Sequence, residues 1–176
     1  NAFQGCEMNA EKQELLPNAY WVLPGKLMAG PYPGDLLPEE LERKLAGLLN
    51  AGVNEFFDLT TPEDGLEPYQ AGLPHDRRAG YRRWAIQDFS VPSQEEMREI
   101  LDELDLLVDS GRTVYLHCWG GRGRTGTVVG CYLARHGLSG EKALARIAEL
   151  RKGTPKGWMD SPETPEQRRM VLEWRD

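Results

Sequence analysis

The chain lacks the features that mark several large classes of protein. Its 176 residues contain only three cysteines, an odd number set far apart, so no disulfide framework is expected and the composition fits a reducing compartment. No run of 18 apolar residues occurs, and no basic segment leads into an apolar one, so neither a helical membrane span nor a signal peptide is predicted. These absences together predict a cytoplasmic protein.

Positive charge is also scarce. The chain has 21 lysines and arginines against 28 acidic residues, and its net charge of -7 argues against a nucleic-acid partner, because that role favours basic surfaces. The three histidines and three cysteines do not combine with carboxylates at metal-ligand spacings, so we expect no metal and no cofactor. The oligomeric state cannot be predicted from this sequence.

The pattern that is present predicts one α/β domain over residues 19–176, preceded by a tail over residues 1–18. The tail contains Cys6, and its first two residues resemble the remnant of a cleaved tag. In the domain, short apolar runs alternate with segments of helical periodicity. Strands are predicted at 20–23, 27–29, 53–59, 81–86 and 113–117, and helices at 41–52, 94–108 after a Ser93–Glu96 capping box, 125–136, 140–151 and 165–174.

The most informative segment is the ten-residue stretch HCWGGRGRTG at positions 117–126. Residues 114–116 run into it as a short apolar strand, and apolar residues at helical spacing follow it over 128–133. The segment therefore predicts a strand, a tight loop and a helix. The thiol of Cys118 stands at the start of the loop and the guanidinium of Arg124 at its end.

This arrangement suits the binding of a phosphate. A helix N-terminus offers unpaired N–H groups and about half a positive charge. Gly120, Gly121 and Gly123 allow the loop to turn successive N–H groups inward. The same field favours the thiolate form of Cys118, and Arg124 can hold two phosphate oxygens at once.

The same segment permits a second interpretation. Residues 121–126 also satisfy the G-x-G-x-x-G fingerprint of dinucleotide-binding folds. That fold needs a second parallel strand, ending in an acidic residue about 20 positions on. Residues 139–151 are instead predicted to be helical, and a nucleotide site would leave Cys118 and Arg124 without a role.

Hydrolysis of a phosphate ester requires an acid that protonates the leaving oxygen. Asp88 lies 30 residues before Cys118, in a loop just beyond the strand predicted at 81–86. An aspartate that merely starts a turn is the alternative interpretation. Asp58 and Asp64 are reserve candidates for the acid.

The pattern His-Cys-x5-Arg-Thr resembles the signature loop of the cysteine-based protein tyrosine phosphatases, in particular the compact dual-specificity branch and its bacterial relatives. The resemblance extends over residues 19–176. It implies a single-domain α/β fold, with a small central mixed sheet flanked by helices. It also implies hydrolysis of a phosphorylated protein or a small phosphomonoester through a phosphocysteine intermediate.

The resemblance assigns roles to individual residues. Cys118 would be the nucleophile, Arg124 would bind the transferring phosphoryl group, and Thr125 would help the thiolate leave. Asp88 would act first as general acid and then as base toward water. His117, predicted to be buried at the end of its strand, would orient the loop through its backbone.

A weaker resemblance concerns the segment SPETPEQ at 161–167. In the tyrosine-specific branch a comparable segment carries a glutamine that positions the hydrolytic water, and Gln167 matches it. Thr164 and Gln167 also form an ordinary capping box with a proline at the first helical position. Both interpretations stay open at the level of the sequence.

The substrate class is less clearly indicated. Arg122 adds a second cation to the loop, as in the tensin-homologue lipid phosphatases, which makes an inositol phosphate or phosphoinositide the alternative substrate. Those loops usually carry two lysines, however, and Trp119 occupies the other position; it can stack on a phosphotyrosine ring or pack on a neighbouring loop. The basic segment at 75–83 is interpreted first as a solvated face. The candidate substrate-binding residues are Trp119, Gly120, Gly121, Arg122 and Gly123.

Two functions of other classes compete with hydrolysis. A phosphate-binding adaptor without catalysis would not need Cys118, Arg124 and Asp88 together. A rhodanese-type enzyme has a comparable loop but lacks an upstream acid of this kind. The sequence therefore favours a phosphatase.

Overall fold

The computed structural model describes residues 16–176, and five short strands form its only sheet within that range. The strands are β1 (Tyr20–Leu23), β2 (Leu27–Gly30), β3 (Glu55–Asp58), β4 (Gly80–Arg83) and β5 (Val114–His117). Their order across the sheet is β1-β2-β5-β3-β4. Only the β1–β2 pair is antiparallel, so the sheet is mixed, as the sequence predicted.

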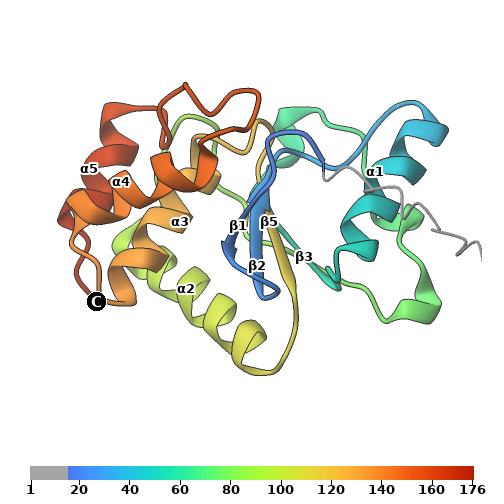
Figure 1. The fold of residues 1–176 in the computed structure, drawn as a ribbon, viewed down its shortest axis with the longest axis horizontal. Coiled ribbons are helices and arrows are strands. Elements are labelled where there is room, and N and C mark those ends of the chain that lie inside the picture. The colour runs from blue at the N-terminus through green and yellow to red at the C-terminus, as the bar shows by residue number, and fades with distance from the viewer. Residues whose placement is uncertain (1–15) are drawn as a thin grey trace, which may run out of the picture.

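Within residues 16–176, five α-helices cover the two faces of this sheet unequally (Figure 1), and three short 3₁₀ helices lie between β3 and β4. The α-helices are α1 (Pro38–Asn50), α2 (Gln94–Asp109), α3 (Arg124–Arg135), α4 (Gly140–Arg151) and α5 (Pro165–Glu173). Helix α1 packs on one face, and α2 to α5 gather on the other (Figure 1). The predicted α/β fold with a small sheet between helices is confirmed.

The central strands are buried on both faces because helices cover both. In β5, Val114 and Leu116 point into the larger core with α2 to α5, whereas Tyr115 points into the smaller core with α1. Phe56 and Phe57 of β3 divide between the two cores in the same way. The alternation follows from the two-residue period of a strand, and full burial explains the continuous apolar runs.

Local signals place the helix ends well. Ser93 accepts a hydrogen bond from the backbone N–H of Glu96 at 3.1 Å, and the Glu96 side chain accepts one from the N–H of Ser93 at 2.7 Å, so the predicted capping box is present. Helix α1 ends at Asn50, two residues before Gly52, whose φ of +99° suits a glycine. No described helix is long and apolar enough to cross a membrane.

Strand β4 is shorter than the sequence predicted. It ends at Arg83 rather than residue 86, although the N–H groups of Trp84 and Ile86 still donate to Asp58 and Leu59. Strand β4 lies at the edge of the sheet and has one neighbouring strand. Residues 84–86 can therefore leave the regular ladder while Trp84 and Ile86 keep these backbone hydrogen bonds. At the start of the described chain, Leu16 is buried in the smaller core, while Cys6 lies outside the described residues.

Candidate active site

The glycine-rich loop forms at the carboxyl end of the central strand. His117 ends β5, Arg124 begins α3, and we call residues 118–123 between them the phosphate loop. Ligands bind at this end of parallel strands in open α/β sheets. The loop lines a pocket of about 180 Å³ together with Asp88, Phe89 and neighbouring side chains.

The phosphate loop fits its surroundings because Gly121 has no side chain. Its φ is +71°, and a Cβ atom built on it would lie 2.3 Å from the carbonyl carbon of Gly30 and 2.6 Å from the nitrogen of Pro31. A Cβ on Gly120 would meet nothing within 4 Å. The loop therefore depends on glycine at position 121 far more than at 120.

We expect Gly121→Ala to lower the free energy of unfolding by about 1–3 kcal/mol and to weaken oxyanion binding, because backbone atoms must shift to admit the methyl group. Gly120→Ala is the matched control and should change both quantities little. Denaturant unfolding and titration with tungstate measure them. Equal effects of the two substitutions would contradict this account of the loop.

Arg124 is the central cation of the site and is 1% exposed. Its Nη1 donates to Asp64 Oδ2 at 2.7 Å and to the Ile86 carbonyl at 2.9 Å, and its Nη2 lies 3.4 Å from Asp88 Oδ1. The two carboxylates thus bracket the guanidinium beside the phosphate loop. Asp88, the acid preferred from the sequence, and Asp64, a reserve candidate, both lie at the site.

Two buried polar atoms at the start of α3 have no hydrogen-bond partner within residues 16–176. They are Nε of Arg124 and Oγ1 of Thr125. Buried polar groups are rarely left unpaired in native proteins, and a catalytic role is one explanation for an exception. Cys118 itself is 3% exposed and lines the pocket. A tetrahedral anion held by the loop would supply an acceptor for Arg124 Nε.

A buried polar network supports the phosphate loop from behind. Nδ1 of His117 lies 3.1 Å from the Cys118 carbonyl, and its Nε2 lies 2.6 Å from the hydroxyl of Tyr69. The carbonyl can only accept, so the ring proton is on Nδ1 and Tyr69 donates to Nε2. Burial lowers the pKa of His117, which keeps the ring neutral.

Asp58, the other reserve acid, belongs to this network rather than to the pocket. Burial alone would raise the pKa of its carboxyl, but hydrogen bonds from Thr60 and Tyr81 hold the pKa below its usual value. Its carboxylate accepts from Thr60 Oγ1 and Tyr81 Oη, each at 2.6 Å. Asp58 thus stabilises the end of β3 next to β5. Tyr69 and Tyr81 carried no signal in the sequence.

The neutral state of His117 makes stability depend on pH. The folded chain binds this proton less readily than the unfolded chain, so stability should fall as the pH drops below about 6.5, by up to about 1.4 kcal/mol per pH unit. Urea unfolding across mildly acidic pH measures this slope. His117→Gln should flatten it, and the exposed control His75→Gln should preserve it. A wild-type midpoint independent of pH in this range would overturn the assignment.

Gln167 lies beside the phosphate loop but does not line the pocket. It is fully buried, and its Oε1 accepts from the N–H groups of Glu163 and Thr164 while its Nε2 donates to the Ser90 carbonyl at 3.3 Å. The capping box with Thr164 is present. The side chain therefore connects the start of α5 to the loop that carries Asp88.

Two residues of the phosphate loop, Arg122 and Trp119, differ in their surroundings. Arg122 Nη1 forms an ion pair with Glu163 at 2.7 Å, and its Nε donates to the Asp160 carbonyl, so its charge is compensated within the protein. Trp119 is 63% exposed at the mouth of the pocket. The Trp119 side chain is available to a ligand, whereas Arg122 lines the same pocket as part of an ion pair.

Two arginines of the basic segment at 75–83 form ion pairs within the fold. Arg82 pairs with Glu55 and Glu103, and Arg83 pairs with Asp58. These ion pairs join β4 to neighbouring elements. Among the described residues, no group of three or more histidines, cysteines or carboxylates could hold a metal ion.

No strand follows β5 in the described chain, so the dinucleotide interpretation fails.

Comparison with known proteins agrees with this geometry. Residues 38–138, more than half of the chain, match the family described as "Polymorphic toxin system, DSP-PTPase phosphatase". The putative tyrosine phosphatase 067L of Invertebrate iridescent virus 3 is 31% identical over 157 residues, which cover 83% of this chain and 60% of the viral protein.

Two further relatives extend the comparison. The PTEN1 phosphatase of Arabidopsis thaliana, described as a phosphatidylinositol 3,4,5-trisphosphate 3-phosphatase and protein-tyrosine-phosphatase, is 33% identical over 96 residues, or 53% of this chain and 22% of that protein. The chain thus spans 60% or less of these curated relatives. The crystal structure of Tk-PTP in its active form superposes with a TM-score of 0.71 at 28% identity, covering 92% of this chain and all of that one.

The family match covers α1 to α3 and so includes the phosphate loop and both carboxylates that bracket Arg124. The solved structure extends the agreement to 92% of the chain. The chain belongs to the dual-specificity-like branch of the cysteine-based protein tyrosine phosphatases.

Proposed function

We propose that this chain hydrolyses phosphomonoesters as a protein tyrosine or dual-specificity phosphatase, through a phosphocysteine at Cys118. The observation that carries the proposal is the convergence of three groups on one pocket. The Cys118 thiol lies at its base, the Arg124 guanidinium closes the loop, and Asp88 lies within 3.4 Å of that guanidinium. A nucleophile, an anion binder and an acid are what transfer of a phosphoryl group to sulfur requires.

The first step transfers the phosphoryl group from substrate to enzyme. The Cys118 thiolate attacks phosphorus in line with the ester oxygen, a sulfur–phosphorus bond forms, and the phosphorus–oxygen bond to the leaving group breaks. Asp88 donates its proton to the departing oxygen. The loop N–H groups and Arg124 hold the three equatorial oxygens throughout, as the negative charge shifts in the loose transition state.

The second step releases phosphate. Water attacks phosphorus, the Asp88 carboxylate takes its proton, and the sulfur–phosphorus bond breaks to restore the thiolate. Thr125 Oγ1, buried without a partner in residues 16–176, donates a hydrogen bond to the departing sulfur. Gln167 acts as a positioning residue, because its bond to the Ser90 carbonyl holds the loop that carries the acid.

Asp64 competes with Asp88 for the role of acid, and leaving-group dependence separates them. Asp88→Asn should lower kcat about 100-fold for a phosphotyrosine peptide but only a few-fold for para-nitrophenyl phosphate, whose leaving group needs little protonation. Asp64→Asn should lower both by similar factors, because Asp64 contacts Arg124 and orients it. A leaving-group dependence found in Asp64→Asn and absent from Asp88→Asn would reverse the assignment.

The surroundings of the pocket favour a phosphorylated protein over an inositol phosphate. Phe89 and Trp119 are exposed aromatic side chains on the pocket wall, suited to a phosphotyrosine ring. Arg122, which suggested a polyanionic head group, is compensated by Glu163. A panel of phosphotyrosine peptides, phosphothreonine peptides and inositol phosphates tests this order of preference.

We also place the activity in a reducing compartment such as the cytoplasm, since a nucleophilic thiol must stay reduced. Both cysteines of the described chain, Cys118 and Cys131, are free thiols.

A further inference from the structure

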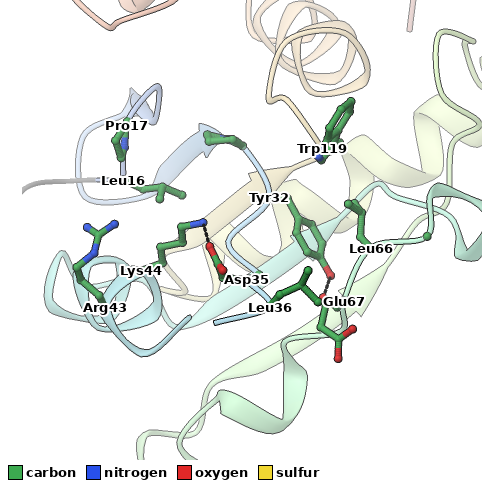
Figure 2. A pocket seen from close by; sticks show the side chains of 13 residues that line it. Leu16, Pro17, Tyr32, Asp35, Leu36, Arg43, Lys44, Leu66, Glu67 and Trp119 are labelled. Carbon is green, nitrogen blue, oxygen red and sulfur yellow. Dashed lines mark hydrogen bonds and ion pairs between the residues drawn. The ribbon is translucent and has the colours of Figure 1, made fainter. Parts of the chain in front are cut away.

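We propose that a groove beside the catalytic pocket binds the part of a phosphoprotein substrate next to its phosphorylated residue, and prefers an apolar side chain there. This inference rests on the proposed phosphatase function and specifies its substrate. The groove has a volume of about 560 Å³ and lies between the start of α1 and the loop over residues 65–67 (Figure 2).

The groove adjoins the catalytic site. Trp119 lines both the groove and the catalytic pocket. Leu66 lines the groove and also a smaller cleft that contains Asp64, Asp88 and Arg124. A substrate whose phosphate reaches Arg124 would therefore have its neighbouring atoms at the entrance to the groove.

Apolar side chains are exposed at this place without a folding reason. Leu36 is 80% exposed and Trp119 is 63% exposed, and both line the groove. Leu37, which follows Leu36 in the chain, is also exposed and occupies the N-cap position of α1, where a serine or aspartate would stabilise the helix better. Exposed apolar clusters at a cleft mark binding surfaces, because covering them with an apolar group removes that area from water.

The groove is already formed, and its two basic side chains pair with carboxylates. The hydroxyl of Tyr32 donates to the Glu67 carbonyl at 2.6 Å, and the N–H of Tyr32 donates to the Trp119 carbonyl at 2.8 Å, so the two sides are held together. At the other end, Lys44 pairs with Asp35 at 2.8 Å (Figure 2). Little ordering is needed on binding, and the lining favours an apolar side chain over a charged one.

A polypeptide fits the two cavities better than a lipid bilayer does. The catalytic pocket, about 180 Å³, holds the phosphorylated side chain, and the adjoining groove of about 560 Å³ needs a ligand that continues beyond it. An extended chain advances about 3.3 Å per residue and so reaches the groove within a few residues. The net charge of -7 opposes docking on an anionic membrane.

Matched phosphotyrosine peptides with leucine or serine at each flanking position test the proposal. Binding is measured on Cys118→Ser, and kcat/KM on the chain with its native cysteine. We expect the preferred leucine peptide to bind about tenfold more tightly than its serine counterpart. Leu36→Ser, added to each background, should reduce this ratio to about threefold or less.

Leu106→Ser on α2 is the control, since Leu106 is 63% exposed and lines no cavity of the site; it should leave the ratio unchanged. A ratio near one in the parent protein, or a ratio that survives Leu36→Ser, would overturn the groove proposal. Loss of phosphoinositide-vesicle binding on Leu36→Ser, with no peptide preference, would instead make the groove a membrane site. Peptide binding is measured on Cys118→Ser, so the groove is tested whether or not the native chain is active. Failure of the native chain to hydrolyse para-nitrophenyl phosphate would refute the proposed function and leave the groove proposal standing.

Discussion

Cys118→Ser should lower the turnover of para-nitrophenyl phosphate by about 10⁴-fold or more while leaving oxyanion binding intact. A serine hydroxyl is a far weaker nucleophile than a cysteine sulfur, so attack on phosphorus is lost. The loop N–H groups and Arg124, which bind the anion, are unchanged. Stopped assays measure the turnover, and titration with tungstate or vanadate measures the binding.

The second buried thiol supplies the control. Burial in the core raises the pKa of Cys131 to about 12, so this thiol does not act as a nucleophile. Cys131→Ser should keep turnover per folded molecule, as checked by circular dichroism. Residual hydrolysis by Cys118→Ser within about tenfold of the wild-type rate would rule out sulfur as the attacking atom.

Arg124→Lys should lower kcat/KM by about 10²–10³-fold although it preserves the charge. The planar guanidinium presents several donors in fixed directions, and Arg124 uses Nη1 on Asp64 and Ile86 while Nε has no partner within residues 16–176. A lysine has one nitrogen and cannot donate to two phosphoryl oxygens with that geometry. The loss should fall mainly on kcat, because the charge that attracts the substrate stays.

Arg122→Lys in the same loop provides the comparison. Its guanidinium is occupied by Glu163 and the Asp160 carbonyl, so this exchange should change kcat/KM less than tenfold. Equal losses of kcat/KM in Arg124→Lys and Arg122→Lys would show that positive charge in general, rather than the planar guanidinium of Arg124, stabilises the transition state.

The contiguous features of this fold could be predicted because local chemistry specifies them. The capping boxes at Ser93 and Thr164 determine where α2 and α5 begin, and the glycine-rich loop follows β5 within a few residues. The order of the strands could not be predicted. The β2–β5 pair joins residues about 90 positions apart, and no periodicity within either strand selects its partner.

The residues of the candidate site also fall into two groups, those in one short motif and those that only the fold brings together. Cys118 and Arg124 stand in one short motif, whereas Asp64 reaches Arg124 across 60 residues and Tyr69 reaches His117 across 48. Asp64 ends one short 3₁₀ helix between β3 and β4 and Tyr69 precedes another, where the sequence shows an acidic turn and an isolated aromatic residue. Only the folded chain shows that these residues complete the surroundings of the phosphate loop.

Capture of the covalent intermediate shows whether the Cys118 sulfur attacks phosphorus. The Asp88→Asn variant should accumulate this intermediate. Loss of the base slows its hydrolysis, whereas loss of the acid slows its formation only a little when the leaving group is good. We would mix this variant with radiolabelled para-nitrophenyl phosphate, quench it in acid within one turnover and digest it. The account predicts label on the peptide that contains Cys118 and none when Cys118→Ser is added. Turnover without protein-bound label, or label on any other residue, would contradict it.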